Sequence, residues 1–159
     1  MKANKRAPQD APGTKKLADY LCFSIYSANL ALNKAYKPIL DKLGLTYTQY
    51  LVVIALSEED DQTVSSLGEK LFLESNTLTP ILKKLETMGY VRRRRDPEDE
   101  RQVRIGLTEA GRRLRQEASP KSVLADTKLT PEELPVVQQA IARVRDNVLA
   151  AVRERAKDD

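Results

Sequence analysis

The strongest constraint on the fold is the order of short elements in residues 62–107. Two short amphipathic helical patterns come first. Two strand-like segments, 91–95 and 102–107, then flank the charged turn DPEDE. A helix pair followed by a basic hairpin is the plan of a winged helix-turn-helix. The sequence therefore predicts a mainly α fold with a small β-wing.

Composition excludes several classes of protein. None of the 159 residues is histidine, and Cys22 is the only cysteine. We therefore expect that the protein binds no metal and no cofactor and is not an enzyme. No apolar run approaches the roughly 20 residues of a membrane span, and the first residues lack the apolar segment of a signal peptide. We expect a cytoplasmic protein with no membrane partner. It would have a disordered tail over 1–14 and a single domain over 15–159.

The N-terminal half of the domain begins with helical patterns. An apolar stripe at steps of three and four predicts a first helix over residues 16–34. Pro38 interrupts the pattern, which favours a second short helix that ends at Leu43, with Gly44 as its stop signal. Further apolar side chains lie off the stripe, and they indicate that a second surface, such as a partner chain, covers this helix.

Polar residues mark the starts of the later helices. Thr46 and Gln49 fit a capping box, and Ser65 and Thr108 are the expected caps of two further helices. Thr130, followed by proline and two acids, predicts the start of the last helix. Its valines and other apolar residues recur over residues 134–152, so it must lie against the first helix or a partner chain.

The second helix of the pair has a polar start, as a DNA-reading helix requires. Pro80 fits the pattern poorly, so the helix either begins near Thr77 or has an irregular first turn. Its inner face is rich in leucine. Its outer face carries the candidate DNA-binding residues Ser75, Asn76, Thr77, Thr79, Lys83 and Lys84.

The predicted hairpin adds positive charge. Residues 83–115 contain eleven Lys and Arg against six acids. The net charge of this segment therefore exceeds the net charge of +4 of the whole chain. Asp99 and Arg101 lie two apart at the tip, so Asp99 is a candidate to orient the Arg101 guanidinium toward a minor groove. The alternatives are an ordinary surface ion pair, worth about 0–1 kcal/mol, and a solvated charged face.

The motif DERQVRIGLTEAGR resembles the wing and following helix of the MarR family of bacterial transcription regulators. The resemblance runs in register over about residues 15–155. It implies an obligate homodimer that binds a near-palindromic operator in double-stranded DNA. Residues 15–45 and 120–155 would then be dimerisation helices, and 46–115 the DNA-binding lobe.

Two further segments resemble the organic-hydroperoxide-sensing branch of that family, OhrR. They are LCFSIYSANLALNKAYKPILDKLGLTYTQYLVVIAL and SNTLTPILKKLE, with its unusual proline. The resemblance implies that Cys22 is the peroxide-sensing residue and that Tyr36 and Tyr47 bond it. Tyr26 matches a further tyrosine near the site.

The chemistry of a peroxide sensor requires a thiolate, which tyrosine hydroxyls and a helix N-terminus can stabilise. Tyr36 is 14 residues beyond Cys22, or about 21 Å along a straight helix. Either the chain folds back near Pro38 or Tyr36 comes from the other subunit, and the resemblance implies the second.

A lone cysteine is more often a small buried core residue, and only the joint match with the tyrosines favours a sensor. No resolving cysteine follows Cys22, unlike in some members of the branch, so its sulfenic acid would react with a small cellular thiol, form a sulfenamide or over-oxidise. The expected function is a repressor that leaves its operator on oxidation of Cys22 by an organic hydroperoxide. A repressor released reversibly by a small aromatic ligand and a thiol peroxidase are the alternatives.

Overall fold

The computed structural model describes residues 15–118 and 121–158 in two compact units, the first ending at Ala118 and the second beginning at Ser119. The predicted tail over 1–14 and the predicted break at Ser119 and Pro120 lie outside the described residues. The first unit consists of η1 (Leu17–Asp19), α1 (Leu21–Lys42), α2 (Tyr47–Glu58), β1 (Gln62–Thr63), α3 (Val64–Leu71), α4 (Ser75–Thr87), β2 (Val91–Arg95), β3 (Val103–Leu107) and α5 (Glu109–Glu117). The second consists of α6 (Lys121–Asp126) and α7 (Glu133–Asp158).

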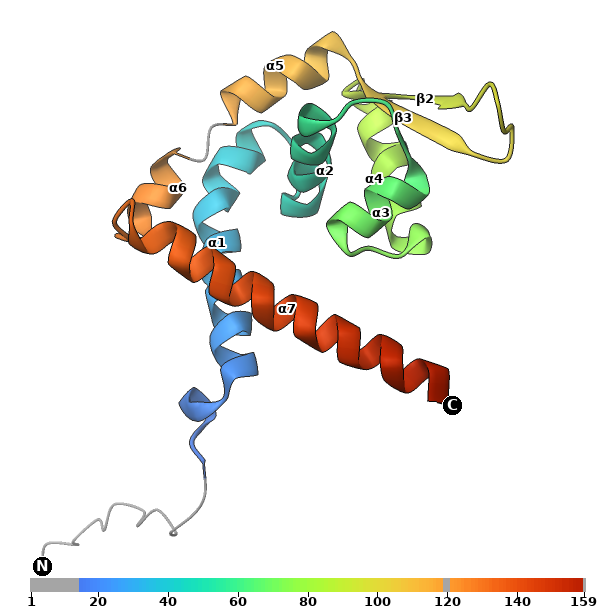
Figure 1. Cartoon of the computed structure of the whole chain (residues 1–159). Coiled ribbons are helices and arrows are strands. Elements are labelled where there is room, and N and C mark those ends of the chain that lie inside the picture. Colours follow the sequence, from blue (N-terminus) through green and yellow to red (C-terminus); the bar gives the residue numbers. More distant parts are fainter. Residues whose placement is uncertain (1–14, 119–120, 159) are drawn as a thin grey trace, which may run out of the picture. The chain divides into compact units, whose positions relative to one another are not determined.

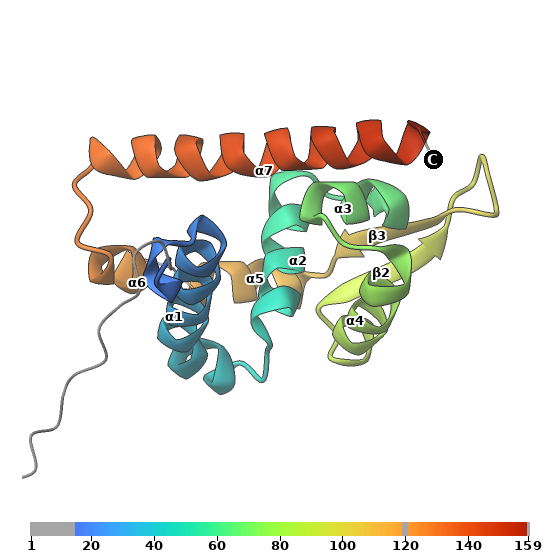
Figure 2. The same ribbon diagram turned by 90° about the horizontal axis from the view of Figure 1, so that it is seen from below.

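A three-stranded antiparallel sheet forms the wing of the first unit. β3 is the central strand and pairs with β1 and β2, with Val91 opposite Leu107 and Gln62 opposite Ile105. The predicted fold class, mainly α with a small β-wing, is therefore confirmed. The β2–β3 hairpin projects beyond the helices of this unit, on the side away from α1 (Figure 1 and Figure 2).

Helix α2 lies between α1 and the α3–α4 pair (Figure 1), and it supplies much of the core of the first unit. Because α2 is apolar on more than one face, it can pack on several neighbours at once. Tyr50, Val53 and Leu56 of this helix have no exposed surface. The residues that meet it from the other elements include Leu40, Leu67, Leu78, Leu82, Leu85, Ile105 and Leu107.

Helix α1 runs without interruption from Leu21 to Lys42, so the predicted break at Pro38 is wrong. Proline removes one helical hydrogen bond, but packing on both sides of it keeps the axis continuous. Tyr36 packs against the core before the proline, and Leu40 is fully buried after it. The helix stops where predicted, because Gly44 adopts a positive φ of 67° and the Leu45 N–H donates to the Leu40 carbonyl.

Two further predictions about the helix pair are corrected. The cap of α3 is Thr63 and not Ser65, since the Thr63 hydroxyl accepts the Ser66 N–H at 3.1 Å. Helix α4 begins at Ser75 and continues through Pro80, so a start near Thr77 is wrong. Leu78 and Leu82 are buried on either side of the proline, and this packing holds the first turn helical.

In the second unit, the chain enters α7 as the sequence indicates. The Thr130 hydroxyl accepts the Glu133 N–H at 3.2 Å, and the Glu133 carboxylate accepts the Thr130 N–H at 2.8 Å. This reciprocal pair is a capping box. Along α7, large apolar side chains that are at least half exposed include Val136, Ile141, Val148 and Val152.

The cap of α2 provides a test of the fold. The Thr46 hydroxyl accepts the Gln49 N–H and the Gln49 amide oxygen accepts the Thr46 N–H, as predicted. Thr46→Ala should lower the free energy of unfolding by about 1 kcal/mol because an N-terminal donor of the helix loses its partner. Urea denaturation followed by circular dichroism measures this change. Thr48→Ala is the matched control, and an equal loss in both variants would contradict the capping role.

Candidate functional site

Helix α4 presents a polar surface, as a DNA-reading helix does. Ser75, Asn76 and Thr77 are exposed in its first turn, while Thr79 is partly buried and donates its hydroxyl to the Ser75 carbonyl at 2.7 Å. Lys83 and Lys84 are exposed one turn later. The leucines of the opposite face are buried, so packing fixes which face points outward.

The tip of the hairpin differs from the prediction. Asp99 and Arg101 lie in the turn between β2 and β3. The Asp99 carboxylate accepts the Arg101 backbone N–H at 3.1 Å and the Gln102 side-chain amide at 3.1 Å. Among the described residues no ion pair joins Asp99 to the Arg101 guanidinium, so Asp99 shapes the turn that carries Arg101, which is exposed.

At the base of the wing, two arginines face each other across the sheet. The register pairs Arg94 with Arg104, and opposed like charges are destabilising unless acids lie between them. Asp61 accepts from the Arg94 guanidinium, and its backbone carbonyl accepts from Arg104 at 2.6 Å. Asp96 accepts from the Arg104 Nε at 2.6 Å. This cluster of Asp61, Arg94, Asp96 and Arg104, the wing-base cluster, ties the hairpin to the loop before β1.

Hydrogen bonds hold both acids of the wing-base cluster in the charged form. The Arg94 guanidinium lowers the pKa of Asp61 below its usual value. The backbone N–H of Glu98, followed by the Arg104 guanidinium, lowers the pKa of Asp96. Since both values are lowered on folding, this stabilisation is present above about pH 4 and is lost as the pH falls further.

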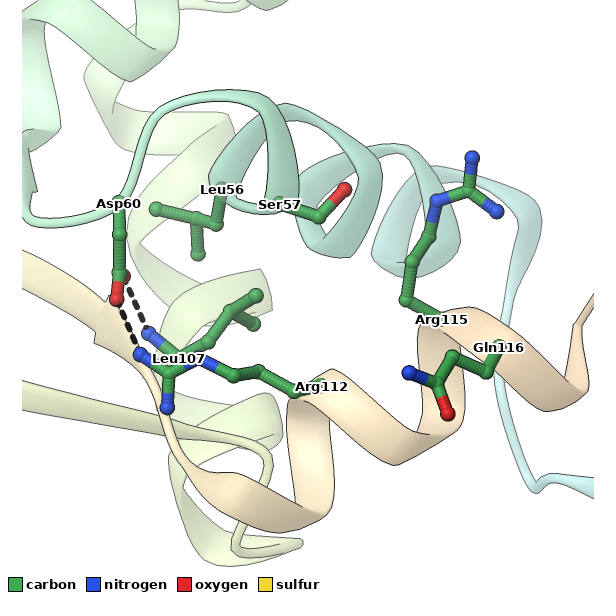
Figure 3. Close-up of a pocket in the computed structure, with 7 residues that line it drawn as sticks. All are labelled: Leu56, Ser57, Asp60, Leu107, Arg112, Arg115 and Gln116. Carbon is green, nitrogen blue, oxygen red and sulfur yellow. Dashed lines mark hydrogen bonds and ion pairs between the residues drawn. The ribbon is translucent and has the colours of Figure 1, made fainter.

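A neighbouring acid, Asp60, ties the same loop to α5. Asp60 accepts the Leu107 N–H at 2.8 Å and the Arg112 guanidinium at 2.6 Å (Figure 3). These contacts border a cavity of about 320 Å³. It is lined by Leu56, Ser57, Asp60, Leu107, Arg112, Arg115 and Gln116. Neither Asp60 nor Asp61 was among the predicted site residues, although an acidic pair directly before β1 is a signal that basic partners lie nearby, here Arg112 for Asp60 and Arg94 for Asp61.

Cys22 is the second residue of α1, and its thiol is free and exposed. Tyr26, one turn further along the helix, has 59% of its surface exposed. Because α1 is continuous to Lys42, Tyr36 lies about 21 Å from Cys22 along the helix axis. The alternative in which the chain folds back to bring these two residues together is therefore wrong.

Tyr36 and Tyr47 do lie together, at the other end of α1. Their ring centroids are 5.1 Å apart, and the Tyr36 ring lies 5.8 Å from the ring of Tyr50. Burial, followed by the neighbouring phenols, raises the pKa of Tyr36, and burial is also the main cause of the raised pKa values of Tyr47 and Tyr50. The hydroxyl groups therefore keep their protons at neutral pH and can act as hydrogen-bond donors.

The described residues contain no group of three or more His, Cys, Asp or Glu that could hold a metal ion. In the same ranges no single helix is long and apolar enough to cross a membrane. Only α1 and α2 taken together have the length and composition of a membrane span, and these two helices are bent by 80° relative to each other.

Comparison with known proteins gives the family. The profile described as transcriptional regulator SarA/Rot matches residues 34–118. The organic hydroperoxide resistance transcriptional regulator of Bacillus subtilis (strain 168) is 44% identical over 128 residues, which cover 79% of this chain and 87% of the relative.

Two solved structures have the same fold and show significant sequence identity. Reduced AbfR bound to DNA, a protein of Staphylococcus epidermidis, is 37% identical with a TM-score of 0.70, and the match covers 84% of this chain and 94% of that one. The regulator MOSR of M. tuberculosis in complex with DNA is 30% identical with a TM-score of 0.73, and the match covers 84% of this chain and 98% of that one. The family of these relatives confirms the prediction of a regulator and not an enzyme. The chain belongs to the MarR family of winged helix-turn-helix transcriptional regulators, in the branch of the organic hydroperoxide resistance regulator.

Proposed function

We propose that the protein is a homodimeric repressor that senses organic hydroperoxides through oxidation of Cys22 and then releases its operator. The observation that carries this proposal is the separation of the two halves of the sensor. The exposed thiol lies at the start of α1, and the paired rings of Tyr36 and Tyr47 lie near its end. The B. subtilis relative, named for organic hydroperoxide resistance, supports the same signal.

A dimer would bring the two halves together. Large apolar side chains on α1, including Leu21, Ile25 and Leu30, are at least 38% exposed in the single chain. An exposed apolar face of this kind is typical of a protein interface. Residues 15–45 and 120–155 are therefore the proposed dimerisation helices, and 46–115 the DNA-binding lobe.

In the assembled sensor, Cys22 of one protomer would accept hydrogen bonds from Tyr36 and Tyr47 of the partner subunit. Neutral phenols can donate to a thiolate and so favour the charged form of the cysteine. Tyr26 lies one helical turn from Cys22 on the same chain and would form part of the wall of the sensor site. Phe23 and Ile25 supply apolar surface, which favours organic hydroperoxides over hydrogen peroxide.

The reaction consumes one hydroperoxide. The Cys22 thiolate attacks one peroxide oxygen, the S–O bond forms as the O–O bond breaks, and the alkoxide takes up a proton and leaves as an alcohol. Sulfur is oxidised by two electrons and the peroxide is reduced. The resulting sulfenic acid condenses with a small cellular thiol to give a mixed disulfide and water. Cys22 is the only cysteine in the sequence, so a disulfide with a second cysteine of the same chain cannot form.

The DNA contacts would come from α4 and the wing. Ser75, Asn76, Thr77 and Thr79 would meet base edges in the major groove, with Lys83 and Lys84 on phosphates. Arg101, carried by the turn that Asp99 shapes, would enter the adjacent minor groove. Two such lobes in a symmetric dimer fit a near-palindromic operator. The DNA-bound structures of AbfR and MOSR support this arrangement.

The cavity beside α5 favours a second candidate function, release by a reversible anionic ligand such as an aromatic acid. Arg112 is paired with Asp60, whereas Arg115 makes no hydrogen bond or ion pair within the described ranges. The two candidates differ in reversibility. Release that dilution reverses without a reductant would support the ligand, and release that only a thiol reductant reverses would support oxidation.

The central test of the proposed function is Cys22→Ser. Wild-type protein should leave a labelled operator after treatment with an organic hydroperoxide and a small thiol, and its intact mass should rise by one thiol adduct. The serine variant should stay bound, because it has no sulfur to oxidise at this position. Fluorescence anisotropy at a fixed, stated salt concentration measures both. Release of the serine variant at the same peroxide concentration would rule the proposal out.

A mixed dimer tests whether the sensor is shared between chains. One chain carries Cys22→Ser and the other carries Tyr36→Phe and Tyr47→Phe. In a shared sensor, the remaining Cys22 faces intact tyrosines of the serine chain and should oxidise at the wild-type rate. In a sensor built within one chain, the same thiol would lack its tyrosines and react slowly. Differently tagged chains and mass spectrometry of Cys22 over time provide the measurement.

The wing-base cluster provides a test of the DNA interface. Asp61→Ala removes a negative charge, which by itself would tighten binding to DNA. We expect instead that the operator affinity falls roughly tenfold, because the wing loses its anchor and Arg101 its position in the groove. Asp41→Ala, which breaks an exposed ion pair with Lys37 on α1, is the charge-matched control and should bind normally. Equal or tighter binding by Asp61→Ala would show that the cluster does not position the wing.

A further inference from the structure

Tyr50 is a fully buried tyrosine that the proposed sensing reaction does not use. Its exposed fraction is 0%, and its hydroxyl donates to the backbone carbonyl of Ala118 at 2.6 Å. The two residues are 68 positions apart in the sequence. Since the Tyr50 hydroxyl is engaged inside the core, it is not available to a thiol at the protein surface.

The acceptor, Ala118, is the residue at which the chain leaves α5. It caps the C-terminus of the helix with a non-helical ψ of 47°, and it is the last residue of the first compact unit. The last carbonyls of a helix have no partner within the helix, and a buried one needs a donor from elsewhere. Ala118 is only 1% exposed, and the Tyr50 hydroxyl supplies that donor.

Tyr50 is also in contact with the proposed sensor. Its ring lies 5.8 Å from that of Tyr36 at a tilt of 43°, and the Tyr36 ring lies 5.1 Å from that of Tyr47. Tyr47 and Tyr50 are three residues apart on α2 and so lie on neighbouring positions of the same helical face. Packed aromatic rings cannot shift independently, because the interior has little free volume.

We propose that Tyr50 is a positioning residue that transmits displacement of Tyr36 and Tyr47 to the end of α5, through its hydrogen bond to Ala118. This inference rests on the proposed function, in which oxidation of Cys22 removes the bonds that those two tyrosines make to the thiolate. Movement of Tyr36 then shifts the Tyr50 ring and releases the Ala118 carbonyl. The last turn of α5, where the first unit continues into the second, loosens and changes the geometry that the operator requires.

The test distinguishes a loss of coupling between Cys22 oxidation and operator binding from a general loss of stability. Tyr50→Phe removes only the hydroxyl, and Cys22 should still be oxidised at the wild-type rate. The ratio of the operator Kd values in the oxidised and reduced states should fall at least about threefold, since the two sites lose part of their coupling. Gln62→Met is the control, because it also removes a buried side-chain donor to backbone carbonyls, those of Ala55 and Glu59. Its ratio of Kd values should match that of the wild type even where its melting temperature falls.

Hydrogen exchange of the wild-type protein provides an independent measurement that does not depend on the variant folding. The Ala118 N–H donates to the Leu114 carbonyl in the last turn of α5, and its exchange should accelerate on oxidation. Unchanged exchange there, or an unchanged ratio of Kd values in Tyr50→Phe, would overturn the role of Tyr50. The proposed function would survive either result, because it is tested separately by the release of wild-type protein and the retention of Cys22→Ser after peroxide treatment.

Discussion

The continuity of α1 is the constraint on which the rest of the structure depends. A single helix from Leu21 to Lys42 places Cys22 and Tyr36 at opposite ends of one rigid element. A hydrogen bond between them within one chain would require a sharp reversal, and packing on both sides of Pro38 prevents it. A sensor that uses both residues must therefore be assembled from two chains, and we propose that oxidation of one thiol acts directly on the interface between protomers.

The first compact unit links three regions through a small number of buried contacts. Helix α2 carries Tyr47 and Tyr50 at its start and ends next to the acidic loop that holds the wing. Asp60 joins that loop to α5, and Tyr50 joins α2 to the other end of α5. The three packed tyrosines Tyr36, Tyr47 and Tyr50, the wing-base cluster and α5 thus belong to one packed body. A displacement at the tyrosines is accordingly expected to reach the DNA-binding surface as a movement of whole elements.

Much of the fold was predictable from local sequence signals. The predictions of helix caps at Thr46, Thr108 and Thr130 and of a helix stop at Gly44 are confirmed. Each of these features depends on hydrogen bonds between residues close in sequence. The errors at Pro38 and Pro80 have one cause: tertiary burial of neighbouring leucines overrides the local preference of proline to break a helix.

The site was predictable only in part. The resemblance identified Cys22, Tyr36 and Tyr47 as candidates, and the pairing of the two tyrosines is present in the structure. The wing-base cluster and the bond from Tyr50 to Ala118 could not be predicted, because they join residues far apart in the chain whose register is set only by folding. Asp99 shows a subtler limit. Its proximity to Arg101 was correct, but the carboxylate bonds the backbone of that residue and shapes the turn.

The most direct measurement of a shared sensor is the connectivity of a disulfide in the variant Tyr36→Cys. If Cys22 of one chain lies beside position 36 of the other, mild oxidation should produce a covalent dimer linked through these two positions. Peptide mapping of a mixture of isotopically light and heavy chains would identify the cross-chain link, and wild-type protein treated in the same way is the control. A disulfide between positions 22 and 36 of the same chain would contradict the account, as would the absence of any bond between these positions.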